Sequence, residues 1–186
     1  KHILEKLDDD DVADIVADME YDEAADVINI LEKERQETIL DLIEEEEEAE
    51  VDEIEELLTY DPYTAGGIMS KDYIAINENQ TVEVALETIR KTDTQDESLS
   101  NICIVDNHGH LLGTVSIRDL LMSSSDKMVS EIYDKEPVSV QADKDQEEVA
   151  QLMMRYDLYT LCVVSKKNKL LGIIYADDIM DVITEE

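Results

Sequence analysis

The 186-residue sequence is poor in basic residues. It has 15 Lys and Arg against 49 Asp and Glu, which leaves a formal net charge of −34. A charge this negative argues against nucleic acid and anionic membrane surfaces as ligands, because both would be repelled. It favours cations or basic proteins as partners. Since 43% of the residues are hydrophobic, the acidity does not indicate a disordered tail, and the chain is long enough for one or two domains with a real core.

Long hydrophobic runs are also missing. No stretch approaches the roughly 18–20 apolar residues that span a bilayer, so we expect no direct membrane insertion. No signal peptide is recognisable at the start of the sequence, and we interpret the chain as a cytosolic piece of a longer polypeptide. The only two cysteines, Cys103 and Cys162, lie in apolar runs. A disulfide scaffold is therefore not expected, and both are predicted to be buried strand residues.

Catalytic signatures are absent from the sequence. It contains no GxSxG, P-loop or HExxH motif. Its three histidines are scattered, and His108-Gly109-His110 is typical of an exposed turn. Neither cysteine has a neighbouring signal for thiolate activation. We therefore expect a protein that is not an enzyme.

The negative charge is concentrated in the first third of the chain. Residues 1–60 hold 25 acidic and 4 basic residues, a net −21, and the remainder has a net −13. Apolar residues recur there at helical spacing, for example Val12, Ile15, Val16 and Met19. This pattern predicts a small all-α domain of three or four short helices over residues 1–60, packed as a bundle or as a superhelical domain, with a boundary at Tyr60-Asp61-Pro62. We interpret the run from Glu44 to Glu48 as a solvated linker.

The rest of the chain contains an internal repeat. Residues 102–106 (ICIVD) return as 161–165 (LCVVS), and 111–120 (LLGTVSIRDL) return as 170–179 (LLGIIYADDI). Each copy reads strand, helix, strand, tight turn, strand, helix, with polar turns at His108-Gly109 and Lys167-Asn168. This order, with a glycine in the last strand and an Asp at the closing helix, resembles a tandem pair of CBS (cystathionine-β-synthase) domains.

The whole chain resembles the cytosolic region of the MgtE family of magnesium transporters. The residues that indicate this are the acidic helical segment, the stretch Ala65-Gly66-Gly67-Ile68-Met69 before the first repeat, and residues 145–150 (DQEEVA). The resemblance implies an α+β multidomain protein: an all-α N domain at 1–60, which we expect to be incomplete, CBS domain 1 at 61–128 and CBS domain 2 at 129–186. The family's membrane domain would be the partner within the same polypeptide, at the cytoplasmic face of the cell membrane.

The resemblance also implies a site for several weakly bound Mg²⁺ ions. Asp10, Asp14 and Asp18 recur every four residues and form one acidic stripe, and Asp178 and Asp181 share a face of the closing helix. Mg²⁺ prefers carboxylate oxygens and keeps much of its water. The positions that correspond to the family's cation-holding residues are Asp10, Asp14, Glu147, Met154 (through its backbone carbonyl), Asp157, Asp178, Asp181 and Glu186.

A second interpretation is that the CBS pair senses an adenine nucleotide such as ATP. The CBS signature of glycine, hydroxyl residue and aspartate is complete in the first copy as Gly113, Ser116 and Asp119. In the second copy Tyr175 stands at the position of the Ser or Thr, so only the first copy is expected to bind a nucleotide in the usual way. The aspartate could equally serve as a helix cap. A plain interaction scaffold is a third interpretation.

The family resemblance implies a homodimer formed through the CBS domains. The apolar closing helices, with Leu120, Leu121, Ile179 and Val182, are the contacts that we expect.

Overall fold

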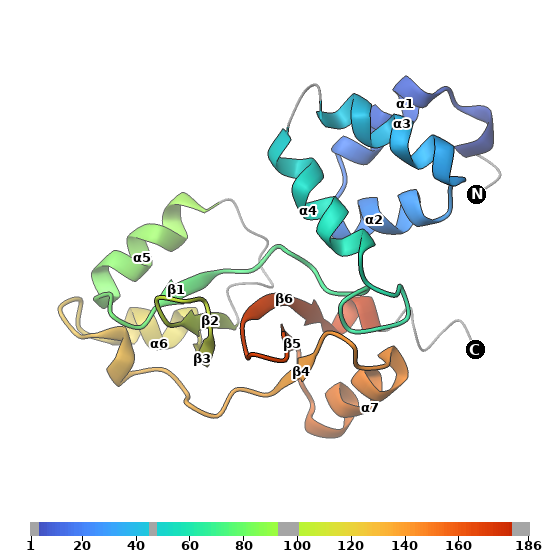
Figure 1. Cartoon of the computed structure of the whole chain (residues 1–186). Coiled ribbons are helices and arrows are strands. Elements are labelled where there is room, and N and C mark those ends of the chain that lie inside the picture. Colours follow the sequence, from blue (N-terminus) through green and yellow to red (C-terminus); the bar gives the residue numbers. More distant parts are fainter. Residues whose placement is uncertain (1–3, 45–47, 93–100, 180–186) are drawn as a thin grey trace.

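The computed structural model has a helical N-terminal domain seated on the two repeats (Figure 1). It describes residues 4–44, 48–92 and 101–179. The helical domain lies at the top of Figure 1, and the two repeats lie beside each other below it. This architecture confirms the predicted α+β class, with a small all-α domain before a pair of mixed sheets. Within the described ranges, no helix is long and apolar enough to cross a membrane.

The N domain is built from short amphipathic helices, as their apolar spacing predicts. Asp8 caps α1 by accepting a hydrogen bond from the backbone N–H of Asp11 at 2.9 Å. Val12 and Val16 of α1 and Ile28 of α2 are fully buried, so each narrow apolar stripe faces another helix. The elements are η1 (Leu4–Lys6), α1 (Asp9–Ala17), α2 (Tyr21–Asn29), α3 (Lys33–Glu44) and α4 (Glu48–Leu58).

Each repeat forms a three-stranded sheet with the same topology. The first two strands are parallel and joined through a helix, and the third is antiparallel to the second. The first repeat contains β1 (Ala75–Asn77), α5 (Val82–Lys91), β2 (Ile102–Val105), β3 (Leu111–Val115) and α6 (Ile117–Met122). A short η3 (Val129–Glu131) precedes the second repeat, which contains β4 (Ser139–Gln141), α7 (Gln146–Tyr156), β5 (Thr160–Val164) and β6 (Leu170–Tyr175).

The two predicted turns have the backbone that their residues favour. Gly109 has φ +80° and Asn168 has φ +61°, and both residue types tolerate this left-handed region. The turns also contact each other, because the N–H of Leu111 donates to the carbonyl of Asn168 and that of Leu170 to the carbonyl of Gly109. The hairpins of the two repeats are thereby joined.

The segment that enters each repeat crosses the last strand of the other repeat. Ser70, ahead of β1, exchanges backbone hydrogen bonds of 2.7 and 3.0 Å with Ile173 of β6. Asp134, ahead of β4, does the same with Thr114 of β3. A Cβ atom on Gly172 would lie 2.7 Å from the carbonyl oxygen of Ser70. Gly172, the glycine of the repeat motif in β6, is therefore required because the two backbones cross too closely for a side chain.

The apolar core continues from the N domain into the second repeat. Leu57 of α4, Ala65 and Met69 of the connecting segment, and Val149 of α7 belong to one buried cluster. The first repeat has its own core around Ile104. A third cluster lies between the repeats and contains Cys103 and Cys162. The predicted burial of both thiols is confirmed, since each is 0% exposed.

Candidate functional site

Acidic side chains of the N domain meet acidic side chains of the CBS pair at the corner between α1 and α2. Asp18, Glu20 and Tyr21 of this corner line a cavity of about 210 Å³ together with Asp72 of the connecting segment. We name Asp18, Glu20, Asp22, Asp72 and Asp178 the acidic corner. Among the described residues, the side chains that line this cavity include three carboxylates and no basic group. Acidic groups of the two domains therefore face each other here.

Asp22 is the most perturbed carboxyl group of the acidic corner. Its pKa is raised to about 7, mainly by burial and also by the negative charges of Asp178, Glu20 and Glu23, against the lowering effect of its own backbone hydrogen bond. Its Oδ1 atom is buried and has no hydrogen-bond partner among the described residues. A buried carboxylate oxygen without a donor is costly, so this position favours either a proton or a cation.

Asp178 is positioned by its place at the start of the closing helix. Its Oδ2 atom accepts a hydrogen bond of 3.3 Å from the backbone N–H of Tyr175, which is the return half of a capping box. The Tyr175 hydroxyl donates to the carbonyl oxygen of Asp72 at 2.5 Å. Burial and the charges of Asp72, Cys103, Asp178 and Glu20 raise the pKa of Tyr175 well above its usual range. Tyr175 therefore stays neutral and occupies the space beside this corner.

The sequence-predicted N-domain ligands lie elsewhere on the same helix. Asp10 and Asp14 are exposed on α1, one to two turns before the corner. The residues that line the cavity with Asp72 come instead from the end of α1 and the start of α2. Sequence reasoning missed Glu20, Asp22 and Asp72. The signal was weak, because acids are so frequent in residues 8–26 that no single carboxylate stands out.

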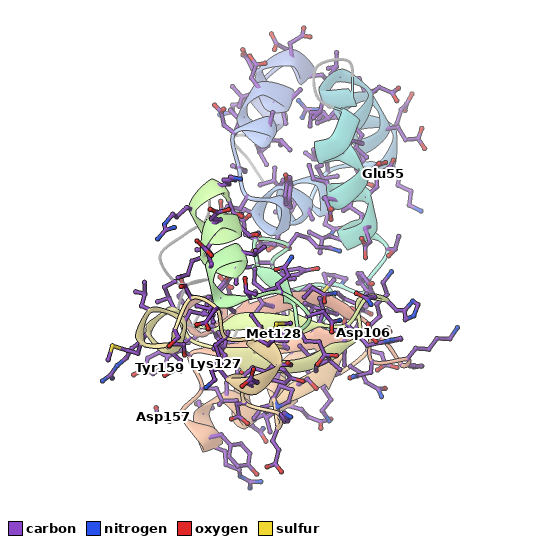
Figure 2. All side chains as sticks on the ribbon, turned by 90° about the vertical axis from the view of Figure 1, so that its left-hand side faces the viewer. Glu55, Asp106, Lys127, Met128, Asp157 and Tyr159 are labelled. Carbon is purple, nitrogen blue, oxygen red and sulfur yellow. The ribbon has the colours of Figure 1, made fainter. Side chains whose placement is uncertain are left out.

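Three predicted residues lie on α7 or at its end, in the second repeat. Glu147, Met154 and Asp157 are all exposed, and Asp157 closes the helix in the left-handed conformation with φ +53°. Figure 2 shows Asp157 at the end of the molecule opposite to Glu55 of α4. The structure does not bring these three to the acidic corner. Asp181 and Glu186 lie outside the described residues.

Across residues 4–44, 48–92 and 101–179, no group of three or more His, Cys, Asp or Glu side chains is arranged to enclose a metal ion. The acidic corner is thus an open surface of neighbouring carboxylates and does not form a set of ligands that surrounds an ion. Such a surface suits a cation that keeps most of its hydration shell, as Mg²⁺ does.

Ser116 and Asp119, the predicted nucleotide residues, form a helix cap. Ser116 accepts a hydrogen bond from the N–H of Asp119 at 3.1 Å and donates its hydroxyl hydrogen to Asp119 Oδ2 at 2.7 Å. The serine, not the aspartate, is the N-cap residue of α6. The Asp119 side chain remains exposed, so its carboxylate can also accept hydrogen bonds from a ligand.

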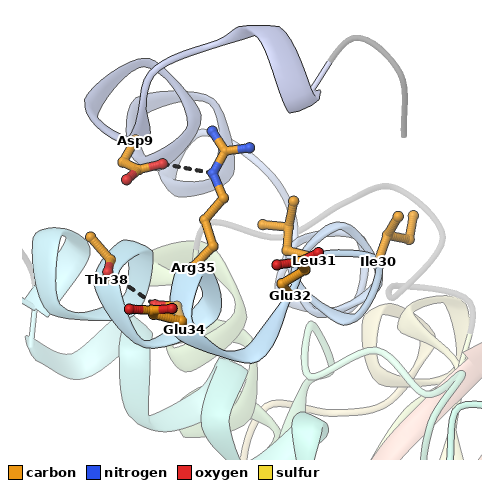
Figure 3. Close-up of a pocket in the computed structure, with 7 residues that line it drawn as sticks. All are labelled: Asp9, Ile30, Leu31, Glu32, Glu34, Arg35 and Thr38. Atoms are coloured by element: carbon orange, nitrogen blue, oxygen red, sulfur yellow. Dashed lines mark hydrogen bonds and ion pairs between the residues drawn. The ribbon is translucent and has the colours of Figure 1, made fainter.

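A cavity of about 600 Å³ on the N domain surrounds Arg35 (Figure 3). Each nitrogen of the guanidinium group donates one hydrogen bond within the chain: Nε to Asp9 Oδ1 at 2.6 Å, and Nη1 and Nη2 to the carbonyl oxygens of Leu4 and Leu7 at 2.8 and 2.7 Å. Arg35 therefore ties the start of the chain to α3. Since all three of its nitrogens bond to other parts of the N domain, we assign it a structural role.

The expected dimer contacts are partly wrong. Leu120 is fully buried and Ile179 is 3% exposed, because both pack into the cores of their own repeats. Neither can contact a second copy. Leu121 and the adjacent Met122 are exposed, and Val182 lies outside the described residues.

The comparisons agree with this architecture. A model of the CBS domain matches residues 65–126 and 129–185, and a model of the MgtE intracellular N domain matches residues 1–63. The chain is therefore a CBS-pair protein with an N domain of the MgtE type.

Two curated relatives and two solved structures define the family more closely. The chain is 40% identical over 134 residues to the magnesium transporter MgtE of Thermus thermophilus, and 38% identical over 137 residues to that of Enterococcus faecalis. These alignments cover 72% and 74% of this chain and 30% of each relative. The chain belongs to the MgtE family of magnesium transporters, and the matched part spans about a third of the length of these curated relatives.

The crystal structure of the soluble part of a magnesium transporter aligns with a TM-score of 0.86 at 34% identity, covering 100% of this chain and 71% of that one. The cytosolic domain of the Mg²⁺ channel MgtE in complex with ATP aligns with a TM-score of 0.69 at 32% identity, covering 95% and 81%.

Proposed function

We propose that this chain is the Mg²⁺-sensing regulatory region of a magnesium transporter, at the cytoplasmic face of the membrane and without catalytic activity of its own. Mg²⁺ bound between the N domain and the CBS pair favours the docked arrangement, and this arrangement favours the closed pore. Loss of Mg²⁺ lets the N domain swing away. The membrane domain of the same polypeptide receives the signal.

The observation that carries this proposal is the relationship between Asp22 and Asp178. They come from different domains, and Asp22 Oδ1 is buried without a hydrogen-bond partner among the described residues. Burial is the main cause that raises the pKa of Asp22, and the charge of Asp178 adds to it. Two carboxylates about 4 Å apart repel by about 1 kcal/mol in water and about 4 kcal/mol at an effective dielectric of 20. A divalent cation bound between two carboxylates attracts both, so the net interaction between the two faces becomes favourable.

Weak binding is sufficient for such a switch. Each site contributes RT ln(1 + [L]/Kd), so four sites at twice their dissociation constant supply about 2.6 kcal/mol. This shifts a two-state equilibrium roughly 80-fold. Asp10, Asp14, Asp178 and Asp181 remain the predicted ligands on the two faces. Glu147, Met154 and Asp157 are exposed and do not line the cavity of the acidic corner, so a cation there, or at Glu186, would be separate from the one at the corner.

Small-angle scattering tests the proposal directly. The radius of gyration of the 186-residue chain should fall when 10 mM MgCl₂ replaces NaCl of equal ionic strength, and Asp178→Ala should weaken this compaction. Asp126→Asn, an exposed acid in the loop after α6, is the matched control and should behave as wild type. An unchanged radius, together with unchanged protease cleavage at residues 60–64, would contradict Mg²⁺ sensing and favour a plain scaffold.

ATP binding at the first repeat is a second candidate function. It is supported by the exposed carboxylate of Asp119, beside Ser116, and by the relative whose cytosolic domain was solved with ATP. Calorimetry should detect ATP binding that Asp119→Ala abolishes and Tyr175→Phe preserves. Binding that survives Asp119→Ala would place the nucleotide elsewhere.

We also propose that the chain forms a homodimer through its CBS domains. The side chains of Leu121 and Met122 are 61% and 81% exposed, and adjacent exposed apolar side chains favour an interface. Sedimentation equilibrium should give twice the 21.2 kDa chain mass. Leu121→Glu combined with Met122→Glu should give the monomer mass.

A further inference from the structure

The segment between the N domain and β1 is bonded at both of its ends to the second repeat. We name residues 61–70 the strap. At its other end Ser70 exchanges two backbone hydrogen bonds with Ile173 of β6. Three backbone hydrogen bonds attach its first half to the region between β4 and α7: Ala65 N–H to the Lys144 carbonyl at 2.7 Å, Gly66 N–H to the Ala142 carbonyl at 2.8 Å, and Gln146 N–H to the Tyr63 carbonyl at 3.0 Å.

The strap is a folded element and not a loose connection. The N–H of Thr64 donates to the carbonyl of Asp61 at 3.0 Å, and the carbonyl of Thr64 accepts from the N–H of Gly67 at 2.9 Å. Ala65 and Met69 are fully buried and belong to the same apolar cluster as side chains of β4 and α7. Moving the strap away from the second repeat would therefore break internal hydrogen bonds and expose buried side chains, and both are costly.

The last backbone bonds of the N domain lie directly ahead of the strap. The N–H of Thr59 donates to the carbonyl of Glu56, and that of Tyr60 to the carbonyl of Leu57, both at 3.1 Å. These bonds span three residues at the end of α4, where helices commonly fray. Among the described residues, no backbone hydrogen bond joins Thr59 or Tyr60 to the second repeat. The backbone bonding thus changes from one domain to the other at this point.

We propose that the N domain turns about a hinge at Thr59 and Tyr60, while the strap stays bound to the second repeat. This inference rests on the proposed function and says where its conformational change takes place. Pro62 fixes its own φ and restricts the backbone of Asp61 before it. The dihedral angles that can change most easily therefore lie at the two residues ahead of Asp61.

The surroundings of the hinge leave room for such a turn. On one side of Tyr60 its ring contacts the strap, since a Cβ atom on Gly66 would lie 2.5 Å from Tyr60 Cδ1. A cavity of about 380 Å³ is lined by Thr59 and Tyr60 of the hinge and by Ser165, Lys166 and Leu171 of the second repeat. The hinge backbone can therefore change direction on this side without displacing a packed side chain.

A hinge at this position separates the two sets of carboxylates in the acidic corner. Those on α2 and at the end of α1 move with the N domain. Asp72 stays with the second repeat, because its carbonyl oxygen accepts the hydroxyl hydrogen of Tyr175. Contacts between α4 and the residues after the strap, such as the 2.7 Å ion pair between Glu56 Oε2 and Lys71 Nζ, exist only in the docked arrangement.

Hydrogen exchange of the 186-residue chain tests the strap without any substitution. The amides of Ala65 and Gly66 should exchange at the same rate in EDTA and in MgCl₂ of equal ionic strength, to within about twofold. Those of Thr59 and Tyr60 should exchange about tenfold faster in EDTA, because the turn breaks their bonds to α4. The amides of β6 are the internal reference. Ala65 and Gly66 amides that lose protection in EDTA together with Thr59 would overturn the hinge.

Electron spin resonance distance measurements test the same division. Labels on Tyr63→Cys and Gln151→Cys report on the strap, and labels on Glu55→Cys and Gln151→Cys report on α4; all three positions are exposed. The native thiols are buried and should not be labelled. We expect a strap distance distribution that is narrow with and without Mg²⁺, and an α4 distribution that is narrow in MgCl₂ and broad in EDTA.

Thr59→Gly adds backbone freedom at the hinge without touching the strap. It should raise the Mg²⁺ concentration at which the α4 distribution becomes narrow by about two- to fivefold, because the undocked state gains conformational entropy. The strap distribution should not change. Ser124→Gly is the matched control, since it adds the same freedom at an exposed position in the loop after α6 and should behave as wild type. An equal effect of the two variants would contradict a hinge at Thr59.

Two outcomes of the distance measurements would overturn the hinge. One is a strap distribution that broadens in EDTA as much as the α4 distribution. The other is an α4 distribution that stays narrow in EDTA. An α4 distribution that is broad with and without Mg²⁺, beside a narrow strap distribution, would support the hinge and contradict Mg²⁺ sensing, so the two failures are distinguishable.

Discussion

The hydroxyl group of Tyr175 donates a hydrogen bond of 2.5 Å to the carbonyl oxygen of Asp72, a residue 103 positions earlier in the chain. This bond joins the end of the second repeat to the segment that leads into the first. Tyr175 occupies the position in the second repeat that Ser116 occupies in the first. Where the first repeat has a serine suited to nucleotide binding, the second repeat thus has a tyrosine that fixes the linker.

Tyr175→Phe should lower the free energy of unfolding by about 1 kcal/mol, because the carbonyl of Asp72 loses its side-chain donor. Chemical denaturation in EDTA measures this. Tyr63→Phe is the control: Tyr63 is 66% exposed and its replacement should change stability by less than about 0.5 kcal/mol. Equal effects of the two variants would show that the Tyr175 bond contributes nothing.

Asp22 should make the chain less stable as pH rises from about 4 to about 7. Its folded-state pKa is raised to about 7 from 3.8, so in this range the folded state binds more protons than the unfolded state, and stability falls with increasing pH. Asp22→Asn removes this dependence. The variant should therefore be stabilised at pH 7.5 in EDTA, by roughly 1–3 kcal/mol, and much less at pH 4.5.

The control for this pH experiment is Glu37→Gln, an exposed acid on α3. It removes one negative charge from the same domain without touching the acidic corner. A stabilisation by Asp22→Asn that is the same at both pH values would mean that Asp22 is not the titrating group.

The two thiols should resist modification while the protein is folded. Cys103 Sγ and Cys162 Sγ lie 3.6 Å apart and both residues are fully buried. The hydrogen bond with Cys162 and burial raise the pKa of the Cys103 thiol well above its usual range, so little thiolate exists to react. A colorimetric disulfide reagent should label neither thiol in buffer and both in denaturant. Ser124→Cys, at an exposed position, should be labelled at once; rapid native labelling of Cys103 would contradict its placement.

Gly172→Ala should destabilise the linker crossing. The added methyl group would lie 2.7 Å from the carbonyl oxygen of Ser70 and 2.8 Å from Met69 Sδ, so the segment must move off β6. We expect a loss of about 2 kcal/mol or more in the free energy of unfolding and faster proteolysis in residues 60–72. Gly109→Asn, where the nearest atom is 3.4 Å away and Asn tolerates the positive φ, should cost much less.

Local sequence patterns determined the elements and their order in this protein. Helical spacing predicts the N-domain helices, because an amphipathic stripe is stable only when it faces other helices. Apolar strands between polar turns predict the repeated sheets, and burial of Cys103 and Cys162 follows from their equivalent places in those strands. The sequence also placed a cap at the start of α6, because a cap depends on residues three positions apart, but it assigned the cap to Asp119 where the structure has Ser116.

Only the tertiary structure decided which acids meet. Asp10, Asp14 and Asp22 are equally acidic in the sequence, yet the corner between α1 and α2 is what reaches the cavity beside Asp72. This depends on the angle at which the N domain sits, which in turn depends on the Ser70–Ile173 crossing and on the pairing of Lys71 with α4. These contacts join residues far apart in the chain, and no local spacing rule encodes them. The net charge of −34 was therefore readable from composition alone, whereas the place where acids of the two domains meet required the fold.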